Sequence, residues 1–190
     1  MNLDLYKKTY DIICKAITKE GAKILEIGCG PGNITKYLLS KRPDYNVYGI
    51  DVALAMVHLA RKNNPTGFFE VMDARHIHRL ETCFDGVICG FCLPYLSPVD
   101  ANKLILDTGK LLNHNGLIYL SFVEGDPDAS HFQSGSSGNR CYFYYHKLEE
   151  LRIKLGEVGF MEIEVSKVEY KKSNEEMEFH TILIAKKYGG

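Results

Sequence analysis

Residues 24–35, ILEIGCGPGNIT, decide how the rest of the chain is interpreted. The apolar residues around Glu26 predict a short strand over 23–28, and the pattern after Gly32 predicts a helix over 33–40. Between the two elements, three glycines fall within five residues. Because glycine lacks a Cβ atom, this spacing indicates a turn that a ligand or another part of the chain approaches closely.

The composition is ordinary for a globular protein. The chain has 190 residues, of which 45% are hydrophobic and 25% charged, and its formal net charge is −1. This length suits a single domain over residues 1–190, and the charge gives no reason to expect nucleic acid as a partner. No apolar run has the length of a membrane span, and the N-terminus lacks the apolar core of a signal peptide. We therefore expect a cytoplasmic protein with reduced thiols and no membrane partner, and we leave a homodimer open.

Strand and helix patterns alternate along the chain. Strands are expected at 23–28, 46–51, 67–73, 84–91 and 116–123, with a final pair at 160–170 and 177–187. Helices are expected at 3–19, 33–40, 53–62, 98–112 and 146–158. The apolar face of the first helix is expected on Leu5, Ile12, Ile13, Ala16 and Ile17. A polar stretch rich in glycine and serine, at 124–139, is expected to be a mobile loop.

This alternation predicts an α/β fold with a doubly wound, mainly parallel sheet. Helical crossovers between consecutive strands give parallel neighbours with helices on both faces. The strand at 84–91 is largely apolar, as a strand covered on both faces should be. A short polar turn joins the final two strands, so we expect them to be antiparallel.

Two of the predicted strands end in carboxylates. Asp51 closes the second strand and Asp73 the third, and in a doubly wound sheet such strand ends meet the glycine loop at the edge where ligands bind. Asp51 suits the hydroxyls of a ribose. Glu26 disfavours a dinucleotide, because a carboxylate repels a pyrophosphate and attracts an amino-acid cation, and Asn33 stands where the dinucleotide fingerprint has its third glycine. An alternative interpretation needs no ligand: the glycines would only form a tight turn between strand and helix, and Asp51 and Asp73 would cap the helices that follow them.

The glycine motif resembles the first motif of class I S-adenosylmethionine-dependent methyltransferases, in which an acidic residue precedes Gly-x-Gly-x-Gly. Further stretches follow in the order of that family: YGIDVALAMVHLA at 48–60, EVMDARHI at 70–77, FDGVICGFCLPYL at 84–96 and LLNHNGLIYLSF at 111–122. The resemblance covers residues 3–187. It implies a seven-stranded sheet of order 3-2-1-4-5-7-6 with the last strand antiparallel. It also implies S-adenosylmethionine as the cofactor and S-adenosylhomocysteine as its product.

The resemblance assigns roles to individual residues. The glycine loop would pass beneath the methionine and ribose parts of the cofactor, Glu26 would orient the amino group, and Asp51 would bind the ribose hydroxyls. Asp73 would accept a hydrogen bond from the adenine amino group. The cofactor-binding residues implied in this way are Glu26, Gly28, Cys29, Gly30, Gly32, Asp51, Val52, Met72, Asp73, Ala74, Cys89 and Gly90.

The resemblance also implies that two regions cover the active site. The segment 124–145 is the predicted lid, and within it Arg140, Tyr142 and Tyr144 alternate along an extended chain, so they share one face. In the N-terminal helix, over residues 1–20, Tyr6 and Tyr10 are expected to cap the pocket. These five side chains are the candidates for substrate binding, and ordinary packing is the alternative for each.

Methyl transfer from a sulfonium mainly requires the protein to position the nucleophile and exclude water. A general base is needed only if the nucleophile arrives protonated. His131 and His146, beside the predicted lid, are the candidates for this base. Cys89 and Cys92 form a Cys-x-x-Cys pair, but the chain has no second pair to complete a zinc site, so we expect no metal.

The substrate is expected to be a small molecule that is methylated at oxygen, nitrogen or carbon. Residues 91–95, FCLPY, lack the Asp/Asn-Pro-Pro-aromatic motif of methyltransferases that act on amino groups of bases or glutamine. Since only a short segment precedes the first strand, the lid is expected from 124–139 or from a partner subunit, unless the chain is shortened. Two alternatives stay open: a non-catalytic or partner-dependent subunit with this fold, and an NAD-dependent oxidoreductase.

Overall fold

The main sheet has seven strands in the predicted order. The computed structural model describes residues 3–134, 140–171 and 177–188. The strands of this sheet are β1 (Lys23–Ile27), β2 (Asn46–Asp51), β3 (Phe68–Val71), β4 (Phe84–Cys89), β5 (Leu112–Val123), β8 (Phe160–Lys171) and β9 (Met177–Lys187). They lie in the order β3-β2-β1-β4-β5-β9-β8, with β1 to β5 parallel and β9 antiparallel to both of its neighbours. The predicted order, with an antiparallel last strand, is confirmed.

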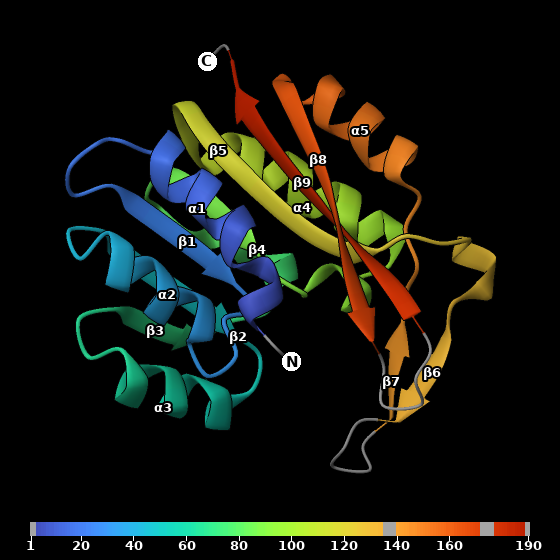
Figure 1. Ribbon diagram of the computed structural model, residues 1–190, viewed down its shortest axis with the longest axis horizontal. Coiled ribbons are helices and arrows are strands. Elements are labelled where there is room, and N and C mark those ends of the chain that lie inside the picture. The colour runs from blue at the N-terminus through green and yellow to red at the C-terminus, as the bar shows by residue number, and fades with distance from the viewer. Residues whose placement is uncertain (1–2, 135–139, 172–176, 189–190) are drawn as a thin grey trace.

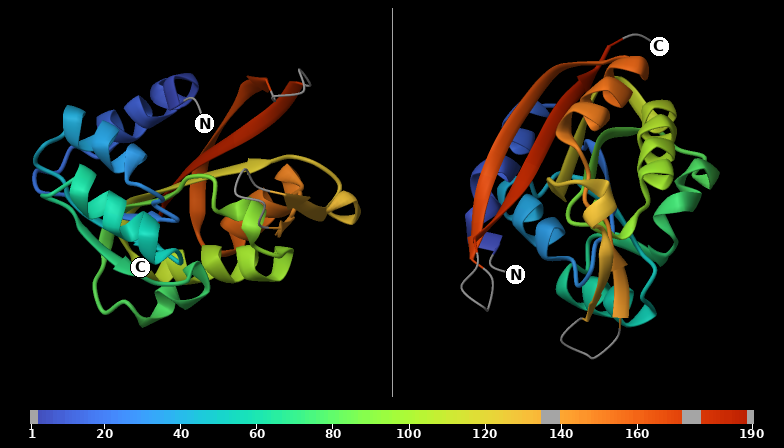
Figure 2. Two further views of the ribbon diagram at one scale, coloured as in Figure 1. Left: turned by 90° about the horizontal axis from the view of Figure 1, so that it is seen from below. Right: turned by 90° about the vertical axis from the view of Figure 1, so that its right-hand side faces the viewer.

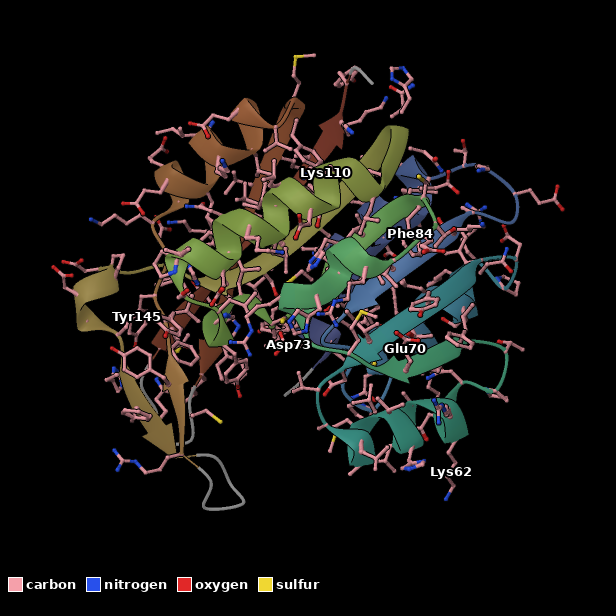
Figure 3. All side chains as sticks on the ribbon, turned by 180° about the vertical axis from the view of Figure 1, so that it is seen from behind. Lys62, Glu70, Asp73, Phe84, Lys110 and Tyr145 are labelled. Carbon is pink, nitrogen blue, oxygen red and sulfur yellow. The ribbon has the colours of Figure 1, made fainter. Side chains whose placement is uncertain are left out.

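Helices cover both faces of this sheet. One face carries α1 (Lys7–Ala16), α2 (Asn33–Lys41) and α3 (Leu54–Asn63), which stand in front of the sheet in Figure 1. The opposite face carries the 3₁₀ helix η2 (Ala74–Arg79), α4 (Pro98–Leu111) and α5 (Leu148–Glu157), as Figure 3 shows from behind. Shorter 3₁₀ turns are η1 (Leu3–Tyr6), η3 (Leu93–Tyr95) and η4 (Pro127–Ala129). The doubly wound architecture predicted from the alternating pattern is therefore confirmed.

The central strands are buried from both sides, as their apolar sequences require. Val87 and Ile88 of β4 are fully buried and belong to opposite clusters, because consecutive side chains of a strand point to opposite faces. One cluster packs β4 against α4 and α5, and the other packs it against α1 and α2. α4 begins as its sequence predicts, with the hydroxyl of Ser97 accepting the backbone N–H of Asp100 at 3.1 Å. The sheet is thus a rigid base for the loops at the carboxyl ends of its strands.

The N-terminal helix is shorter than predicted, and the buried side of this segment includes the expected Ile13 and Ile17 together with two tyrosines. Leu5 is 42% exposed, whereas Tyr6, Tyr10 and Ile13 are almost fully buried. The expected face counted aliphatic residues and left the tyrosines out. An aromatic ring carries a large apolar area, so two tyrosines outweigh one leucine in deciding which face packs on the sheet.

The segment between β5 and α5 contains a hairpin, of which the first strand lies where the sequence predicts a loop and the second lies where it predicts an extended segment. Strands β6 (His131–Ser134) and β7 (Arg140–Phe143) pair antiparallel, with His131 opposite Phe143. Figures 1 and 2 show this hairpin standing apart from the main sheet. A strand of four residues gives little periodic signal, which is why the sequence does not predict β6. Residues 135–139 of the predicted mobile loop lie outside the described residues. Within the described ranges, no helix combines the length and the apolar character needed to cross a lipid bilayer.

Candidate functional site

The glycine loop turns from β1 into α2 beneath a neighbouring segment. Gly28 has φ +68°, a conformation that L side chains rarely adopt, and a Cβ atom there would lie 2.9 Å from Cβ of Cys92. Gly32 has φ +78° at the N-cap of α2, where a Cβ atom would lie 3.2 Å from Cα of Ala60. Close approach of the chain therefore explains these two glycines, and it leaves the backbone of Gly28 facing a cavity.

The carboxylate of Asp51 holds this loop in place. One of its oxygens accepts the backbone N–H of Gly30 at 2.8 Å, and the other accepts the N–H of Ala53 at 2.8 Å. The loop is also tied to α3, since the side chain of Asn63 donates to the carbonyl of Pro31 at 2.9 Å. Each carboxylate oxygen has a second lone pair, so Asp51 can still accept hydrogen bonds from a ligand.

A cavity of about 340 Å³ opens at the carboxyl ends of the strands. Six of the twelve predicted cofactor-binding residues line it: Gly28, Asp51, Val52, Met72, Asp73 and Ala74. In Figure 3, the labelled Asp73 lies at this end of the strands, and Phe84, where β4 begins, lies at the opposite end. The convergence of three strand ends on one cavity is the arrangement that the sequence predicts.

Glu26 lies behind the loop, in the buried part of β1. Its carboxylate accepts the hydroxyl of Thr35, and its second oxygen, Oε1, has no hydrogen-bond partner in the structure. Burial raises the pKa of Glu26 to about 7. A buried carboxylate with one unsatisfied oxygen is suited to a cationic ligand group, which would supply both the missing hydrogen bond and the missing charge.

The other predicted cofactor residues form the support behind the cavity wall. Cys29 packs with α3 and β3 in a small buried cluster, and Cys89 is fully buried in the main core. Burial raises the pKa of both thiols, so they stay protonated. Gly30 donates to Asp51, Gly32 caps α2, and the side chain of Ile34 fills the space where a Cβ atom of Gly90 would lie.

Asp73 forms an ion pair with Arg75, a residue for which the sequence analysis predicted no role. Its carboxylate accepts the backbone N–H of Arg75 at 2.9 Å, and Nε and Nη2 of the same residue at 2.9 and 2.5 Å. The guanidinium holds the pKa of Asp73 below its ordinary value. Since Arg75 also lines the cavity, it brings a positive charge beside the two aspartates. The only signal for it in the sequence is its position two residues after a strand-end aspartate.

Six further lining residues were not predicted. They come from η2, from the segment after β4 and from the hairpin: Arg75, Phe91, Cys92, Tyr95, Leu96 and Cys141. Phe91 has φ +64°, which is rare for a residue with a side chain, and its N–H donates to the buried hydroxyl of Ser121 at 2.7 Å. This strained turn aims the aromatic ring along the cavity wall, as strained residues at binding sites often do.

The hairpin reaches the cavity through the face opposite to the predicted one. Cys141 lines the cavity, and Phe143, two residues along the same strand, contacts the ring of Tyr95 at 6.3 Å between centroids. The expected side chains, Arg140 and Tyr142, therefore belong to the other face of β7. Arg140 lies over the ring of Phe132 at 5.0 Å, and Tyr142 donates to the carbonyl of Ser130 at 2.9 Å. Tyr144 packs on Tyr142, with ring centroids 4.7 Å apart.

The two N-terminal tyrosines lie in the core and do not line the cavity. Tyr10 is fully buried between the rings of Tyr37 and Tyr119. Tyr6 is fully buried as well and meets the cavity wall through Phe91, with ring centroids 4.8 Å apart. Their hydroxyl groups face the protein interior, so the structure gives them no direct position against a ligand in the cavity.

The two histidines predicted as general bases, His131 and His146, are also not among the residues that line the cavity. His146 is buried and donates from Nε2 to the carbonyl of Leu93 at 3.0 Å, and burial lowers its pKa. Its backbone N–H donates to Val123, so it fastens η3 to the end of β5. His131 is exposed on β6 and donates from Nδ1 to the carbonyl of Ala129 at 2.9 Å. In the part of the chain that the structure describes, no three His, Cys, Asp or Glu side chains gather closely enough to hold a metal ion.

Comparison with known proteins connects this geometry to a family. A family model described as a methyltransferase domain matches residues 24–116. Trans-aconitate 2-methyltransferase of Variovorax paradoxus is 35% identical over 63 residues, which are 33% of this chain and 24% of that protein. A methyltransferase structure from Methanosarcina mazei has a TM-score of 0.77 at 21% identity and covers 94% of this chain and 98% of its own. Magnesium protoporphyrin IX methyltransferase of Synechocystis PCC 6803, with S-adenosylmethionine bound, has a TM-score of 0.70 at 21% identity over 97% of this chain and 80% of its own.

These matches agree with the sheet and the cavity. The family model spans the glycine loop and all the strand ends from β1 to β4 that surround the cavity. The chain spans about a quarter of the length of the trans-aconitate methyltransferases that it matches. The strand order, the cavity at the strand ends and the matched domain lead to one conclusion: residues 24–116 match a methyltransferase domain, and the chain has the fold of class I S-adenosylmethionine-dependent methyltransferases.

Proposed function

We propose that the chain binds S-adenosylmethionine in the cavity between the glycine loop, Asp51 and Asp73, and that it transfers the methyl group to a small molecule. The observation that carries the proposal is the convergence of three strand ends on this one cavity, with the unsatisfied carboxylate oxygen of Glu26 buried behind it. The match of residues 24–116 to a methyltransferase domain supports the same reaction. We treat the whole of residues 1–190 as a single catalytic domain.

The residues present suit the cofactor. Asp51 can accept hydrogen bonds from the ribose hydroxyls while it holds the loop, and Val52 and Met72 offer apolar contact to the base. Asp73 is already paired with Arg75, so the pair can present both donors and acceptors to the adenine edge. Glu26 suits the ammonium group of the methionine part, because a cation removes the cost of burying its charge.

When bound, S-adenosylmethionine supplies a methyl group that is activated by the positive sulfur. The protein then has to hold the acceptor in line with that group and keep water away. The wall formed by Phe91, Cys92 and Leu96 is apolar and suits this exclusion. Tyr95 and Cys141 close the cavity from the side of the hairpin, which supports the prediction that 124–145 acts as the lid.

The acceptor is proposed to be a small molecule. The two relatives described above are named for small-molecule substrates, trans-aconitate and magnesium protoporphyrin IX. The net charge of −1 gives no general attraction to nucleic acid. A location in the cytoplasm and a homodimer stay predictions.

Calorimetric titration tests the proposal. Purified protein is titrated with S-adenosylmethionine, S-adenosylhomocysteine and NAD, and the titration is repeated on Asp51→Ala. Binding of the two sulfur nucleosides that is lost in the variant is the expected result. Binding of NAD alone would show an oxidoreductase instead, and binding without methyl transfer to any acceptor would indicate a non-catalytic or partner-dependent subunit.

A further inference from the structure

Lys103 of α4 contacts three groups from two elements. Its ammonium nitrogen, Nζ, lies 3.0 Å from the backbone carbonyl of Arg75 and 3.1 Å from Nδ1 of His78, both in η2. It also forms an ion pair with the carboxylate of Asp107, one turn further along α4. Figure 3 shows α4 and η2 side by side on this face of the sheet, with Asp73 labelled where η2 begins. Lys103 therefore joins the two elements where they meet.

The chemistry of the groups decides which atom donates. A lysine ammonium has three hydrogens and no lone pair, so Lys103 is the donor in all three contacts. Nδ1 of His78 accepts one of these hydrogens, and the hydrogen of this neutral imidazole therefore lies on Nε2. The three donors of Lys103 and the three acceptors around it match in number.

Burial of Asp107 keeps Lys103 in this position. The side chain of Asp107 is 6% exposed, whereas that of Lys103 is 43% exposed. An exposed lysine usually contributes little through an ion pair, because its long side chain is free to move into water. Here that movement would leave a buried carboxylate without its cation, which is costly. His78 lies 3.8 Å from the same carboxylate, but its Nδ1 already accepts from Lys103.

The carbonyl that Lys103 binds belongs to a residue of the cavity wall. Arg75 lines the cavity, and its backbone N–H and its guanidinium both donate to the carboxylate of Asp73. The backbone of Arg75 is thus held from two directions, its N–H by Asp73 and its C=O by Lys103. Lys103 itself is not among the residues that line the cavity. A shift of η2 against α4 would consequently move Asp73 and Arg75 together.

We propose that Lys103 is a positioning residue for the cofactor: it holds η2 where Asp73 and Arg75 meet the adenine ring, and in this way it sets how strongly the protein selects a purine that carries a 6-amino group. The inference rests on the proposed binding of S-adenosylmethionine in this cavity and adds to it the origin of this selectivity. Lys103 acts through the backbone of Arg75, and Asp107 fixes Lys103.

Selectivity for the amino group is the quantity that a shift of η2 changes most. The carboxylate of Asp73 is the proposed acceptor for this group, and a hydrogen bond weakens steeply when donor and acceptor move out of line. The ribose and methionine parts are assigned to Asp51, Glu26 and the glycine loop, which belong to β1, β2 and the turn between β1 and α2. Loss of Lys103 should therefore affect recognition of the amino group more than binding of the rest of the cofactor.

Calorimetric titration with two ligands tests the proposal. The ligands are S-adenosylhomocysteine and its purine analogue, which lacks only the 6-amino group. The unchanged protein is expected to bind S-adenosylhomocysteine at least about tenfold more tightly than the analogue, as one hydrogen bond to a charged group allows. Lys103→Met is expected to reduce this ratio to about threefold or less. Lys103→Arg keeps the charge and the donors, so it should restore most of the ratio.

A second variant separates positioning from loss of stability. Lys103→Met alone leaves the buried carboxylate of Asp107 unpaired, which can prevent folding. The double variant Lys103→Met, Asp107→Leu removes both charges and avoids this cost, and it is expected to show the same loss of selectivity. An unchanged ratio in the double variant would overturn the proposal.

A matched variant controls for the loss of an ion pair as such. Lys154 pairs with Glu157 on its own helix at 3.1 Å, but this helix is α5, and neither residue lines the cavity. Lys154→Met is therefore expected to keep the ratio of the unchanged protein. A loss of selectivity in Lys154→Met as large as that in Lys103→Met would show that the effect is not specific to the contact with η2.

A measurement on the ligand-free protein tests the contact itself. Long-range ¹H–¹⁵N spectra of histidine-labelled protein at alkaline pH, assigned with His78→Gln, are expected to show hydrogen on Nε2 of His78 and a shift of Nδ1 in Lys103→Met. Hydrogen on Nδ1 instead would contradict the contact.

The titration also separates this inference from the proposed function. Failure of the unchanged protein to bind S-adenosylhomocysteine removes the proposed function and the role of Lys103 with it. Binding of both ligands without preference for the 6-amino group removes the role of Lys103 alone.

Discussion

Oδ2 of Asp51 accepts the backbone N–H of Gly30 at 2.8 Å, and this contact joins the end of β2 to the glycine loop that follows β1. The same carboxylate therefore shapes the loop and stands ready for a ligand. Its second oxygen is held by the N–H of Ala53, at the N-cap of α3. A residue that orders the site and also contacts the ligand should affect binding more strongly than a residue that does either alone.

Asp51→Ala is predicted to weaken binding of S-adenosylhomocysteine by at least about tenfold, since a hydrogen bond to a charged group contributes about 1.5–3 kcal/mol. The measurement is calorimetric titration. Asp44→Ala is the control. The carboxylate of Asp44 also accepts hydrogen bonds that hold a loop, from the backbone N–H of Gly21 and from Arg42, but Asp44 does not line the cavity. Similar losses of affinity in the two variants would contradict the direct role of Asp51.

Gly28→Ala is predicted to lower the free energy of unfolding by about 1–3 kcal/mol, because the new Cβ atom would meet Cys92 and because φ is positive. Gly30→Ala is the matched comparison. Its φ is +51°, but no atom lies within 4 Å of the position of a Cβ atom. It should therefore carry only the backbone cost, about 1–2 kcal/mol. Chemical denaturation of both variants measures the difference, and equal losses would show that the contact with Cys92 does not matter.

The fold follows from the sequence because its strands and helices have clear periodicity. The strand predicted at 46–51 matches β2 in both of its ends, and the short turn after residue 170 correctly predicts that β8 and β9 are antiparallel. The pairing of β6 with β7 was not predicted, although β7 falls in the segment expected to be extended, since four-residue strands outside the main sheet have no buried face to produce an alternating pattern. On α1, Ile13 is buried as expected, but Tyr10 was left out of the expected face because only aliphatic residues were counted.

The site could be predicted only where it lies at a strand end. Asp51 and Asp73 were found because the doubly wound topology brings strand ends together. Cys141 was missed because its place in the wall depends on which face the hairpin turns inward, and no local pattern decides that.

At alkaline pH and without ligand, the Glu26→Gln variant is predicted to have a higher free energy of unfolding than the unchanged protein. Burial raises the pKa of Glu26 to about 7 in the folded state, above its ordinary value of 4.5, so the folded protein binds the proton more tightly than the unfolded chain. The resulting stabilisation is complete below about pH 4.5 and is lost as the pH rises through about 7. This loss is on the order of 3 kcal/mol, and Gln avoids it because it does not titrate.

Thermal unfolding at several pH values measures this effect. The difference in melting temperature between Glu26→Gln and the unchanged protein should grow in favour of the variant between pH 5 and pH 8. The same variant should bind S-adenosylmethionine more weakly, because an amide cannot neutralise its ammonium group. A melting-temperature difference that is constant with pH would contradict the buried, titrating carboxylate.

Cys92 and Cys141 are predicted to be protected by S-adenosylhomocysteine from an aromatic disulfide reagent. Both thiols line the cavity, although they come from the segment after β4 and from the hairpin. Cys83 is the internal control, since it is exposed at the other end of β4 and should react at the same rate with and without ligand. Cys29 and Cys89 are buried with raised pKa values and should stay unmodified in the folded protein.

Mass spectrometry of the modified peptides measures each cysteine separately. Protection of Cys92 alone would place the ligand against the segment after β4 and leave the hairpin out of the site. Protection of both would bring Cys141, and with it the inward face of β7, into the wall that a bound cofactor meets. Equal reaction of Cys83, Cys92 and Cys141 in the presence of saturating ligand would contradict the assignment of the cofactor to this cavity, because a nucleoside that fills it cannot leave both lining thiols open to a bulky reagent.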